Sequence, residues 1–174
     1  MAELTAAQLY DYIACPHRVA LDRFGAIAER EEVSPFVRLL WERGSAFERQ
    51  VAETLPEETE VLVDLAGEEK LTRTFEAIEA RRPAIYGGRI ASDGLLGEPD
   101  LLLLRGNGYI AADIKSGRGE TGGDEGEFGS LKPHYAVQVA LYTDILEKLG
   151  HSSGRIAEIW DIRGWSEPLD FLQR

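Results

Sequence analysis

The sequence predicts an α/β domain in which helices flank a mixed β-sheet, with additional helices at the N-terminus. Two apolar runs flank Gly106-Asn107-Gly108, turn chemistry that tolerates positive φ, so residues 98–115 are expected to form a β-hairpin. Residues 101–104 are all leucine, which is typical of a central strand covered by helices on both faces. Segments with helical periodicity precede and follow this hairpin, and the combined order contains α-β-β-β-α-β.

Two helical regions are expected before the first strand. Thr5-Ala6-Ala7-Gln8 is a capping box that begins a helix, and Pro16 divides that helix into two shorter pieces. Cys15 is expected to be a small buried hydrophobe. Ser34-Pro35 supplies an N-cap and a first-turn proline for the next helix. The expected buried stripe of that helix consists of Phe36, Leu40, Phe47 and Val51.

The rest of the chain alternates between strands and helices. Residues 60–65 predict an edge strand and residues 84–92 a second strand, in which Gly87-Gly88 marks a bulge or a close backbone approach. Residues 116–130 hold six glycines and no apolar periodicity, so they predict a loop that either covers the site or is a plain insertion. Helices are expected over 68–82, with Leu71, Phe75 and Ile78 buried, and over 133–149, and a last strand over 155–161.

Composition is typical of one globular domain. The 174 residues are enough for a full hydrophobic core. A lone cysteine excludes an intrachain disulfide, and the sequence has neither a recognisable leader nor an apolar run of about eighteen residues, so we expect a cytoplasmic protein without membrane contact. Because the ending carries no terminal signal, the single domain 1–174 is either complete or the N-terminal part of a longer chain.

Three charged side chains of the hairpin are expected on one face of the sheet. Asp113 and Lys115 are two positions apart on one strand and therefore point to the same side. A two-residue turn at Gly106-Asn107 sets Asp100 opposite Asp113, whereas a turn at Asn107-Gly108 sets it opposite Lys115. Both registers keep the three side chains together, but a three-residue loop without a bulge would send Asp100 to the other face.

Adjacent carboxylates on one sheet face indicate a metal site. Cross-strand pairing holds two such groups about 5 to 8 Å apart, where they repel each other unless a cation lies between them. Oxygen ligands suit Mg²⁺ or Mn²⁺, and Mg²⁺ is usually held by one or two carboxylates together with water and substrate phosphate. Lys115 adds a charge that orients or deprotonates a water. The alternative is a surface hairpin whose ion pair contributes little to stability.

Pro99-Asp100 followed by Asp113-Ile114-Lys115 resembles the PD-(D/E)XK signature of the restriction-endonuclease-like nucleases. The wider chain is similar to their RecB-type branch, which includes CRISPR-associated adaptation nucleases. The stretch 10–18 resembles the opening of these proteins, and Gln138-x-x-x-Tyr142 matches a motif in the helix after the Asp-Ile-Lys strand. Gly44 and Glu48 stand where the family has glycine followed four residues later by a metal-binding histidine, so this chain departs from the pattern there.

This resemblance implies a restriction-endonuclease-like core and a Mg²⁺- or Mn²⁺-dependent deoxyribonuclease of DNA repair, recombination or defence. The implied catalytic residues are Asp100, Asp113 and Lys115. The implied metal ligands are Glu48, Asp100, Asp113 and the Ile114 carbonyl. Gln138 and Tyr142 would bind the DNA, and Glu98 would be an outer-shell acid. The implied partners are single-stranded DNA or duplex ends, with a helicase or a further nuclease domain. Relatives that use a cysteine before proline in an iron–sulfur cluster need four thiolates, so we expect no such cluster here.

The charge of the chain favours a different class of protein. A net charge of −12 argues against a general nucleic-acid footprint, which draws on clustered Lys and Arg. Metal binding reverses the local sign at carboxylates, and a groove can still be lined by the arginines at 18, 23, 38, 43, 49, 73, 81 and 82. The alternative function is a non-catalytic nucleic-acid or protein interaction module on the same fold.

Overall fold

The computed structural model describes residues 3–117, 120–121, 130–162, 164–165 and 169–170. The helices are α1 (Ala6–Ala14), α2 (Pro16–Phe24), α3 (Pro35–Ala52), α4 (Gly67–Glu79) and α5 (Pro133–Lys148), with a 3-10 turn η1 (Ile27–Glu29). The strands are β1 (Leu4–Thr5), β2 (Glu60–Val61), β3 (Ala84–Tyr86), β4 (Ile90–Ser92), β5 (Leu95–Gly97), β6 (Leu101–Arg105), β7 (Gly108–Ile114), β8 (Glu120–Thr121), β9 (Ser130–Leu131), β10 (Ser152–Asp161), β11 (Gly164–Trp165) and β12 (Leu169–Asp170).

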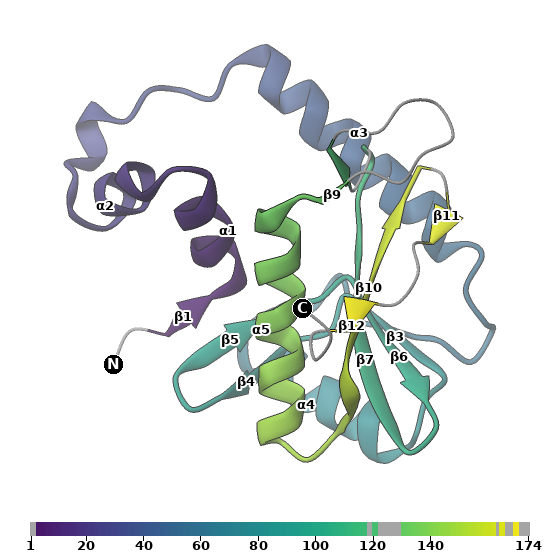
Figure 1. Ribbon diagram of the computed structural model, residues 1–174. Coiled ribbons are helices and arrows are strands. Elements are labelled where there is room, and N and C mark those ends of the chain that lie inside the picture. The colour runs from purple at the N-terminus through teal and green to yellow at the C-terminus, as the bar shows by residue number, and fades with distance from the viewer. Residues whose placement is uncertain (1–2, 118–119, 122–129, 163, 166–168, 171–174) are drawn as a thin grey trace.

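The main sheet is mixed and has the order β11-β10-β7-β6-β3-β2, with β12 paired to β10. β10 runs parallel to β7 and β2 parallel to β3, while the other pairs are antiparallel. A smaller sheet has the order β1-β5-β4. This arrangement confirms the expected mixed α/β class with helices against the sheet (Figure 1). No helix in the described ranges is both long and apolar enough to cross a membrane.

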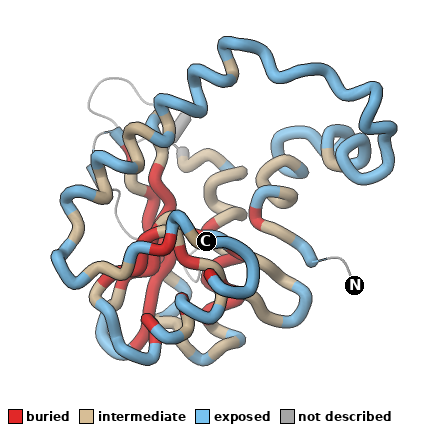
Figure 2. The backbone as a smooth tube through the Cα atoms, turned by 180° about the vertical axis from the view of Figure 1, so that it is seen from behind, coloured by how far each residue is buried: buried red, intermediate tan, exposed pale blue. Residues whose placement is uncertain are grey.

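Alternating residues of the central hairpin build two cores, one on each face of the sheet. Leu102 and Ala111 belong to the core shared with α1, α4 and α5, whereas Leu101 and Ile110 belong to the core that packs against Phe47 and the rest of the C-terminal half of α3. Buried residues concentrate in these strands (Figure 2). The prediction of a central all-leucine strand is confirmed, because β6 lies between β7 and β3.

In the N-terminal region the helices begin where they were predicted, but two predictions of buried residues are wrong. The Thr5 capping box is present, and Pro16 begins a second helix. Cys15 is exposed rather than buried, because it is the extended residue that joins α1 to α2. Phe36 and Leu40 are 68% and 48% exposed. Only the C-terminal half of α3 lies over the sheet, and its first turns extend beyond it (Figure 1), so Phe47 and Val51 pack against the core while Phe36 and Leu40 do not belong to it.

The segment 84–92 is two strands rather than one. The chain leaves β3 at Gly87, which has φ of +69°, and enters the smaller sheet as β4. A Cβ at Gly87 would lie 2.5 Å from Val63 Cγ1, which confirms the close approach expected there. The buried face of α4 is also rotated from the expected one, since Leu71 and Phe75 are only half-buried. Its buried residues are Lys70, Thr74, Ala77 and Ile78.

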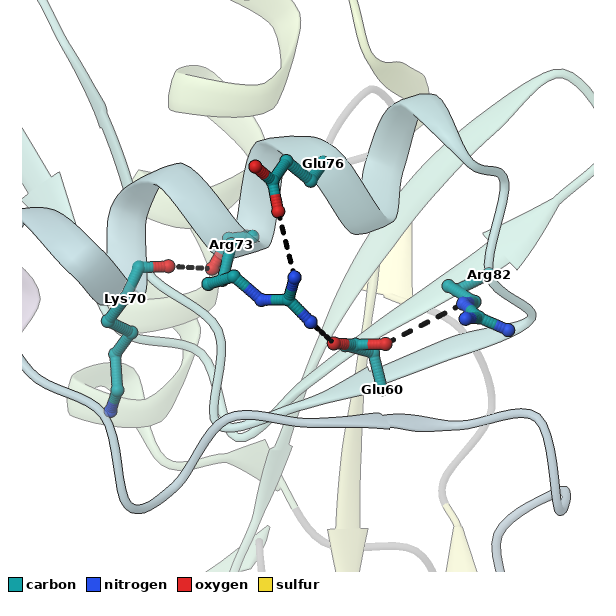
Figure 3. Close-up of polar contacts among 6 residues, drawn as sticks. Glu60, Lys70, Arg73, Glu76 and Arg82 are labelled. Carbon is teal, nitrogen blue, oxygen red and sulfur yellow. Dashed lines mark hydrogen bonds and ion pairs between the residues drawn. The ribbon is translucent and has the colours of Figure 1, made fainter.

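Edge strand β2 is shorter than expected and is tied to α4 by ion pairs. Arg73 of α4 donates to Glu60 Oε1 at 2.6 Å and to Glu76 Oε2 at 3.0 Å, and Arg82 lies 3.6 Å from the other Glu60 oxygen (Figure 3). Arg81 donates to the Gly106 carbonyl at 2.9 Å. These three arginines therefore hold β2, α4 and the hairpin turn together, and their contacts do not indicate a binding groove.

The C-terminal elements follow the expected order. α5 begins at Pro133, and Gly150 just beyond it has φ of +73°. β10 spans Ser152–Asp161, three residues longer at its start than expected. The predicted loop 116–130 lies mostly outside the described residues, and near its ends β8 pairs with β9.

Candidate functional site

The hairpin register sets Asp100 opposite Asp113. Arg105 pairs with Gly108, so the turn is the two-residue one at Gly106-Asn107, and Leu101 pairs with Ala112. Asp100 directly precedes β6, and its Oδ2 accepts a hydrogen bond of 2.6 Å from the Ile114 N–H. The first of the two predicted registers is therefore the one present.

Lys115 lies against the carboxylate pair. Its ammonium forms an ion pair with Asp113 Oδ2, and Asp113 is only 2% exposed. All three side chains lie on the α5 face, because Asp113 alternates with Ile114, which packs into the α3-side core. The Lys115 N–H donates to the Trp160 carbonyl at 2.8 Å, so β10 fixes the backbone at this point.

Burial dominates the electrostatics of the pair. Desolvation raises the pKa of Asp100 well above its ordinary value, repulsion from Asp113 raises it further, and Lys115 lowers it. Desolvation also raises the pKa of Asp113, and the opposing effect of Lys115 does not cancel it. Burial works against the charge of Lys115, but the two aspartates outweigh it and its pKa is raised. Lys115 therefore remains an ammonium ion at neutral pH.

A hydrogen-bonded chain leads from Lys115 into α5. The Lys115 Nζ donates to Gln138 Oε1 at 3.4 Å, and Gln138 Nε2 donates to the Tyr142 hydroxyl at 3.1 Å. That hydroxyl donates to the Glu98 carbonyl at 3.3 Å. Burial raises the pKa of Tyr142, so its hydroxyl stays neutral and can donate. The Gln138 and Tyr142 side chains therefore lie on the side of α5 that faces Lys115.

Gly97 explains how Tyr142 fits below the site. A Cβ at position 97 would lie 2.5 Å from Tyr142 Cδ1, so only glycine leaves room for the ring. The neighbouring Glu98 is directed elsewhere: its carboxylate accepts a hydrogen bond of 2.7 Å from Arg89. The backbone carbonyl of Glu98 takes part in the chain to Lys115, and its carboxylate acts on that chain through its charge, which raises the pKa of Tyr142.

Glu48 reaches the same region from α3. Glu48, Ile114, Lys115 and Gln138 line a cavity of about 520 Å³. Desolvation raises the pKa of Glu48, Lys115 lowers it and Asp113 raises it, so its charge interacts with those of the hairpin. Gly44, one turn earlier, lines the cavity too, and a Cβ there would lie 3.8 Å from Ser116 Oγ. The predicted placement of Glu48 towards Asp113 is confirmed.

The donors around Asp100 fit one hard cation that keeps water ligands. Asp113 Oδ2 is a buried oxygen that faces the Lys115 ammonium and the Asp100 carboxyl group. In a strand the N–H and C=O of one residue point to the same side, so the Ile114 carbonyl is directed towards Asp100. Two carboxylates and a carbonyl match the way Mg²⁺ is commonly held.

The structure also limits this metal site. In the part of the chain that the structure describes, no three His, Cys, Asp or Glu residues are grouped closely enough to hold a metal ion. Glu48 therefore lines the cavity beside Lys115 and feels the charge of Asp113, but it does not complete a three-residue cluster with the two aspartates. Asp100, Asp113 and the Ile114 carbonyl would be the direct ligands, and Glu48 would act through water.

Sequence reasoning missed three aromatic residues around the site. The Lys115 Nζ lies 5.0 Å from the ring centre of Tyr135, and Tyr10 and Trp41 line the cavity. Helical spacing was the available signal. Tyr135 lies three residues before Gln138, and Trp41 lies seven before Glu48, which places each on its neighbour's face of the helix.

Comparison of this chain with protein-family models and with curated protein sequences finds no match. The geometry of the site and the order of the elements therefore carry the functional argument.

Proposed function

We propose that this chain is a Mg²⁺- or Mn²⁺-dependent nuclease of the PD-(D/E)XK type that hydrolyses phosphodiester bonds of DNA. The observation that carries the proposal is the buried pair Asp100 and Asp113 beside Lys115, which lines a cavity together with Glu48 and Gln138. The order α4, β3, β6, β7, α5, β10 supports a restriction-endonuclease-like core. Folding alone gives no reason to bury two carboxylates side by side, because their desolvation is unfavourable.

The residues have separable roles in this reaction. A bound Mg²⁺ or Mn²⁺ would supply Lewis-acid activation of the phosphodiester and of a water molecule. Asp100 and Asp113 would hold the cation through their carboxylates. The water oxygen bonds to phosphorus, one P–O ester bond breaks, and the leaving oxygen takes up a proton.

Lys115 acts as an electrostatic group in this proposal rather than as a base. Its raised pKa keeps it protonated at neutral pH, so it stabilises charge that develops on the phosphate. Gln138 fixes the ammonium through the 3.4 Å contact, and Tyr142 fixes Gln138 in turn. A substrate phosphate that enters the cavity therefore meets the Lys115 ammonium group in a fixed orientation.

A second candidate function is a non-catalytic interaction module on the same fold. Lys115 already neutralises part of the charge of Asp113, the described residues hold no three-residue metal group, and the net charge is −12. In this alternative the aspartates and Lys115 form a buried ion-pair network, and a partner docks without being cleaved.

Cleavage assays distinguish the two functions. Labelled single-stranded and duplex DNA are incubated at low salt with Mg²⁺, with Mn²⁺ and with EDTA, beside the variants Asp113→Asn and Asp64→Asn. The nuclease proposal expects metal-dependent cleavage by the wild type and by the exposed-site control Asp64→Asn, and none by Asp113→Asn. Equal cleavage by Asp113→Asn, or metal-independent cleavage, contradicts it. Binding without any cleavage supports the module.

A further inference from the structure

Trp41 is an exposed aromatic residue on the wall of the candidate active-site cavity. It lies on α3 seven residues before Glu48, which is two turns and about 10 Å along the helix axis. Both side chains line the cavity, and Trp41 remains 60% exposed. Within the described ranges, its indole makes neither a hydrogen bond nor a ring contact. The indole is therefore largely open to solvent and is held by neither a hydrogen bond nor a stacked ring among these residues.

The other aromatic wall of the cavity is already held in place. Tyr10 packs edge-on against His134 with ring centres 4.6 Å apart, and it lies 6.0 Å from Tyr135. The cavity thus presents one fixed aromatic cluster, on α1 and α5, and one free indole, on α3. Its volume of about 520 Å³ is within the range of small-ligand sites.

A positively charged side chain, Arg38, lies beside the free indole on α3. Arg38 lies one turn before Trp41, which makes the two residues neighbours on the helix surface. No ion pair joins Arg38 to a described residue, whereas Arg18 on α2 is paired with Asp11 and Asp22. A base-stacking aromatic beside an unpaired arginine is the combination that binds a single strand through its bases and its backbone.

We propose that Trp41 stacks on a base of an unpaired DNA strand whose phosphate enters the site, and that it thereby selects single-stranded over duplex substrate. This inference rests on the proposed function, because it takes the strand to run from Trp41 towards Glu48 and Lys115. The 10 Å between Trp41 and Glu48 spans about three stacked nucleotides at 3.4 Å each. Bases within a duplex are already stacked and paired, so only an unpaired base can offer its face to the indole.

The test measures binding apart from cleavage. Labelled single-stranded oligonucleotide and the matching duplex are titrated by fluorescence anisotropy with Mg²⁺ present, in an Asp113→Asn background that cannot turn over. Trp41→Ala should weaken single-strand binding about 5- to 100-fold, the range for loss of one stacked base, with little change for duplex. Trp41→Phe should restore most of the affinity.

Two controls separate stacking from general damage to the helix. Phe36→Ala removes another aromatic of α3, 68% exposed and outside the cavity lining, and should leave binding unchanged. An abasic site is moved along the oligonucleotide. At one position the abasic site should lower the affinity of the protein that retains Trp41. At that position it should not lower the affinity of the Trp41→Ala variant further, because both changes remove the same contact. Circular dichroism checks that each variant is folded.

The outcomes separate this inference from the proposed function. Trp41-dependent binding together with cleavage by the otherwise wild-type chain supports both, and Trp41-dependent binding without cleavage supports the stacking role while contradicting the nuclease. Cleavage of single strands with equal affinity in Trp41→Ala overturns the stacking role alone. Absence of single-strand binding, or equal losses for Trp41→Ala and Phe36→Ala, also overturns it.

Discussion

Replacing Asp100 by asparagine should make the protein more stable in EDTA and less responsive to Mg²⁺. The change removes one of two facing buried charges but keeps an amide oxygen that can accept the Ile114 N–H hydrogen bond. It also leaves the ion pair between Lys115 and Asp113 in place. The variant therefore isolates the repulsion between the two carboxylates.

The magnitude follows from Coulomb's law. Two charges about 5 Å apart repel by about 3 kcal/mol at an effective dielectric constant of 20. Lys115 cancels part of this repulsion, so we expect a gain of about 1 to 3 kcal/mol in the free energy of unfolding at pH 7. For a chain of this length, 1 kcal/mol shifts Tm by about 2 to 4 °C, so a gain of this size should raise Tm by about 2 to 12 °C.

The gain should depend on pH in one direction. The pKa values of Asp100 and Asp113 are raised above the ordinary value of 3.8, so the folded protein binds protons that the unfolded chain releases. The contribution of these groups to stability is complete below pH 3.8 and is lost as the pH rises through the folded values. In acid, Asp100→Asn should therefore have about the same free energy of unfolding as the wild type. As the pH rises, the free energy of unfolding of Asp100→Asn should exceed that of the wild type by a growing amount.

Thermal unfolding followed by circular dichroism measures the effect, with Asp64→Asn as an exposed control of equal charge change. Saturating Mg²⁺ should stabilise the wild type by about 2.7 kcal/mol at 100 times Kd and Asp100→Asn by much less. Repulsion between the two carboxylates is excluded if Asp100→Asn gains no more stability than Asp64→Asn in EDTA or if the gain is independent of pH. A metal site at Asp100 is excluded if Mg²⁺ stabilises the wild type and Asp100→Asn equally.

The remaining predictions concern the residues around the pair. Lys115→Ala should keep or tighten metal binding in calorimetry, because a competing cation is gone, while turnover falls by about 10² to 10⁴; unchanged turnover would contradict its role. Glu48→Gln should raise the Mg²⁺ concentration needed for half-maximal cleavage by about 10-fold, while Tm in EDTA should not fall, because burial already disfavours the charge of Glu48; an unchanged Mg²⁺ requirement would place Glu48 outside the metal site. Tyr142→Phe should lower the free energy of unfolding by about 1 kcal/mol, because Gln138 loses its acceptor, and a neutral result in denaturant titration would argue against that hydrogen bond.

The hairpin could be predicted in detail because its signals are local. Turn chemistry at Gly106-Asn107-Gly108 and the period of two along a strand determine which side chains share a face. Of the two registers that these signals allow, the structure has the one with the turn at Gly106-Asn107. The same locality explains the success with the Thr5 capping box and with Pro16. The grouping of Asp100, Asp113 and Lys115 followed from these rules alone.

The failures concern features that depend on tertiary packing. Phe36 and Leu40 have helical spacing, but burial also requires a surface to pack against, and the sheet does not extend below the first turns of α3. The smaller sheet was missed because β1, β4 and β5 have only two or three residues each, too few to show a period. The side-chain contact between Glu98 and Arg89 forms across a turn whose geometry the sequence does not specify.

Anomalous diffraction can show whether a divalent ion binds between Asp100 and Asp113. Crystals soaked in Mn²⁺ should show an anomalous peak within about 2.0 to 2.3 Å of one oxygen of each carboxylate, with the Ile114 carbonyl completing one side of the coordination shell. The same soak applied to Asp113→Asn should give no peak at this position. An absent peak in the wild type, or a peak bound only elsewhere on the surface, at a Mn²⁺ concentration that supports cleavage, would contradict the account.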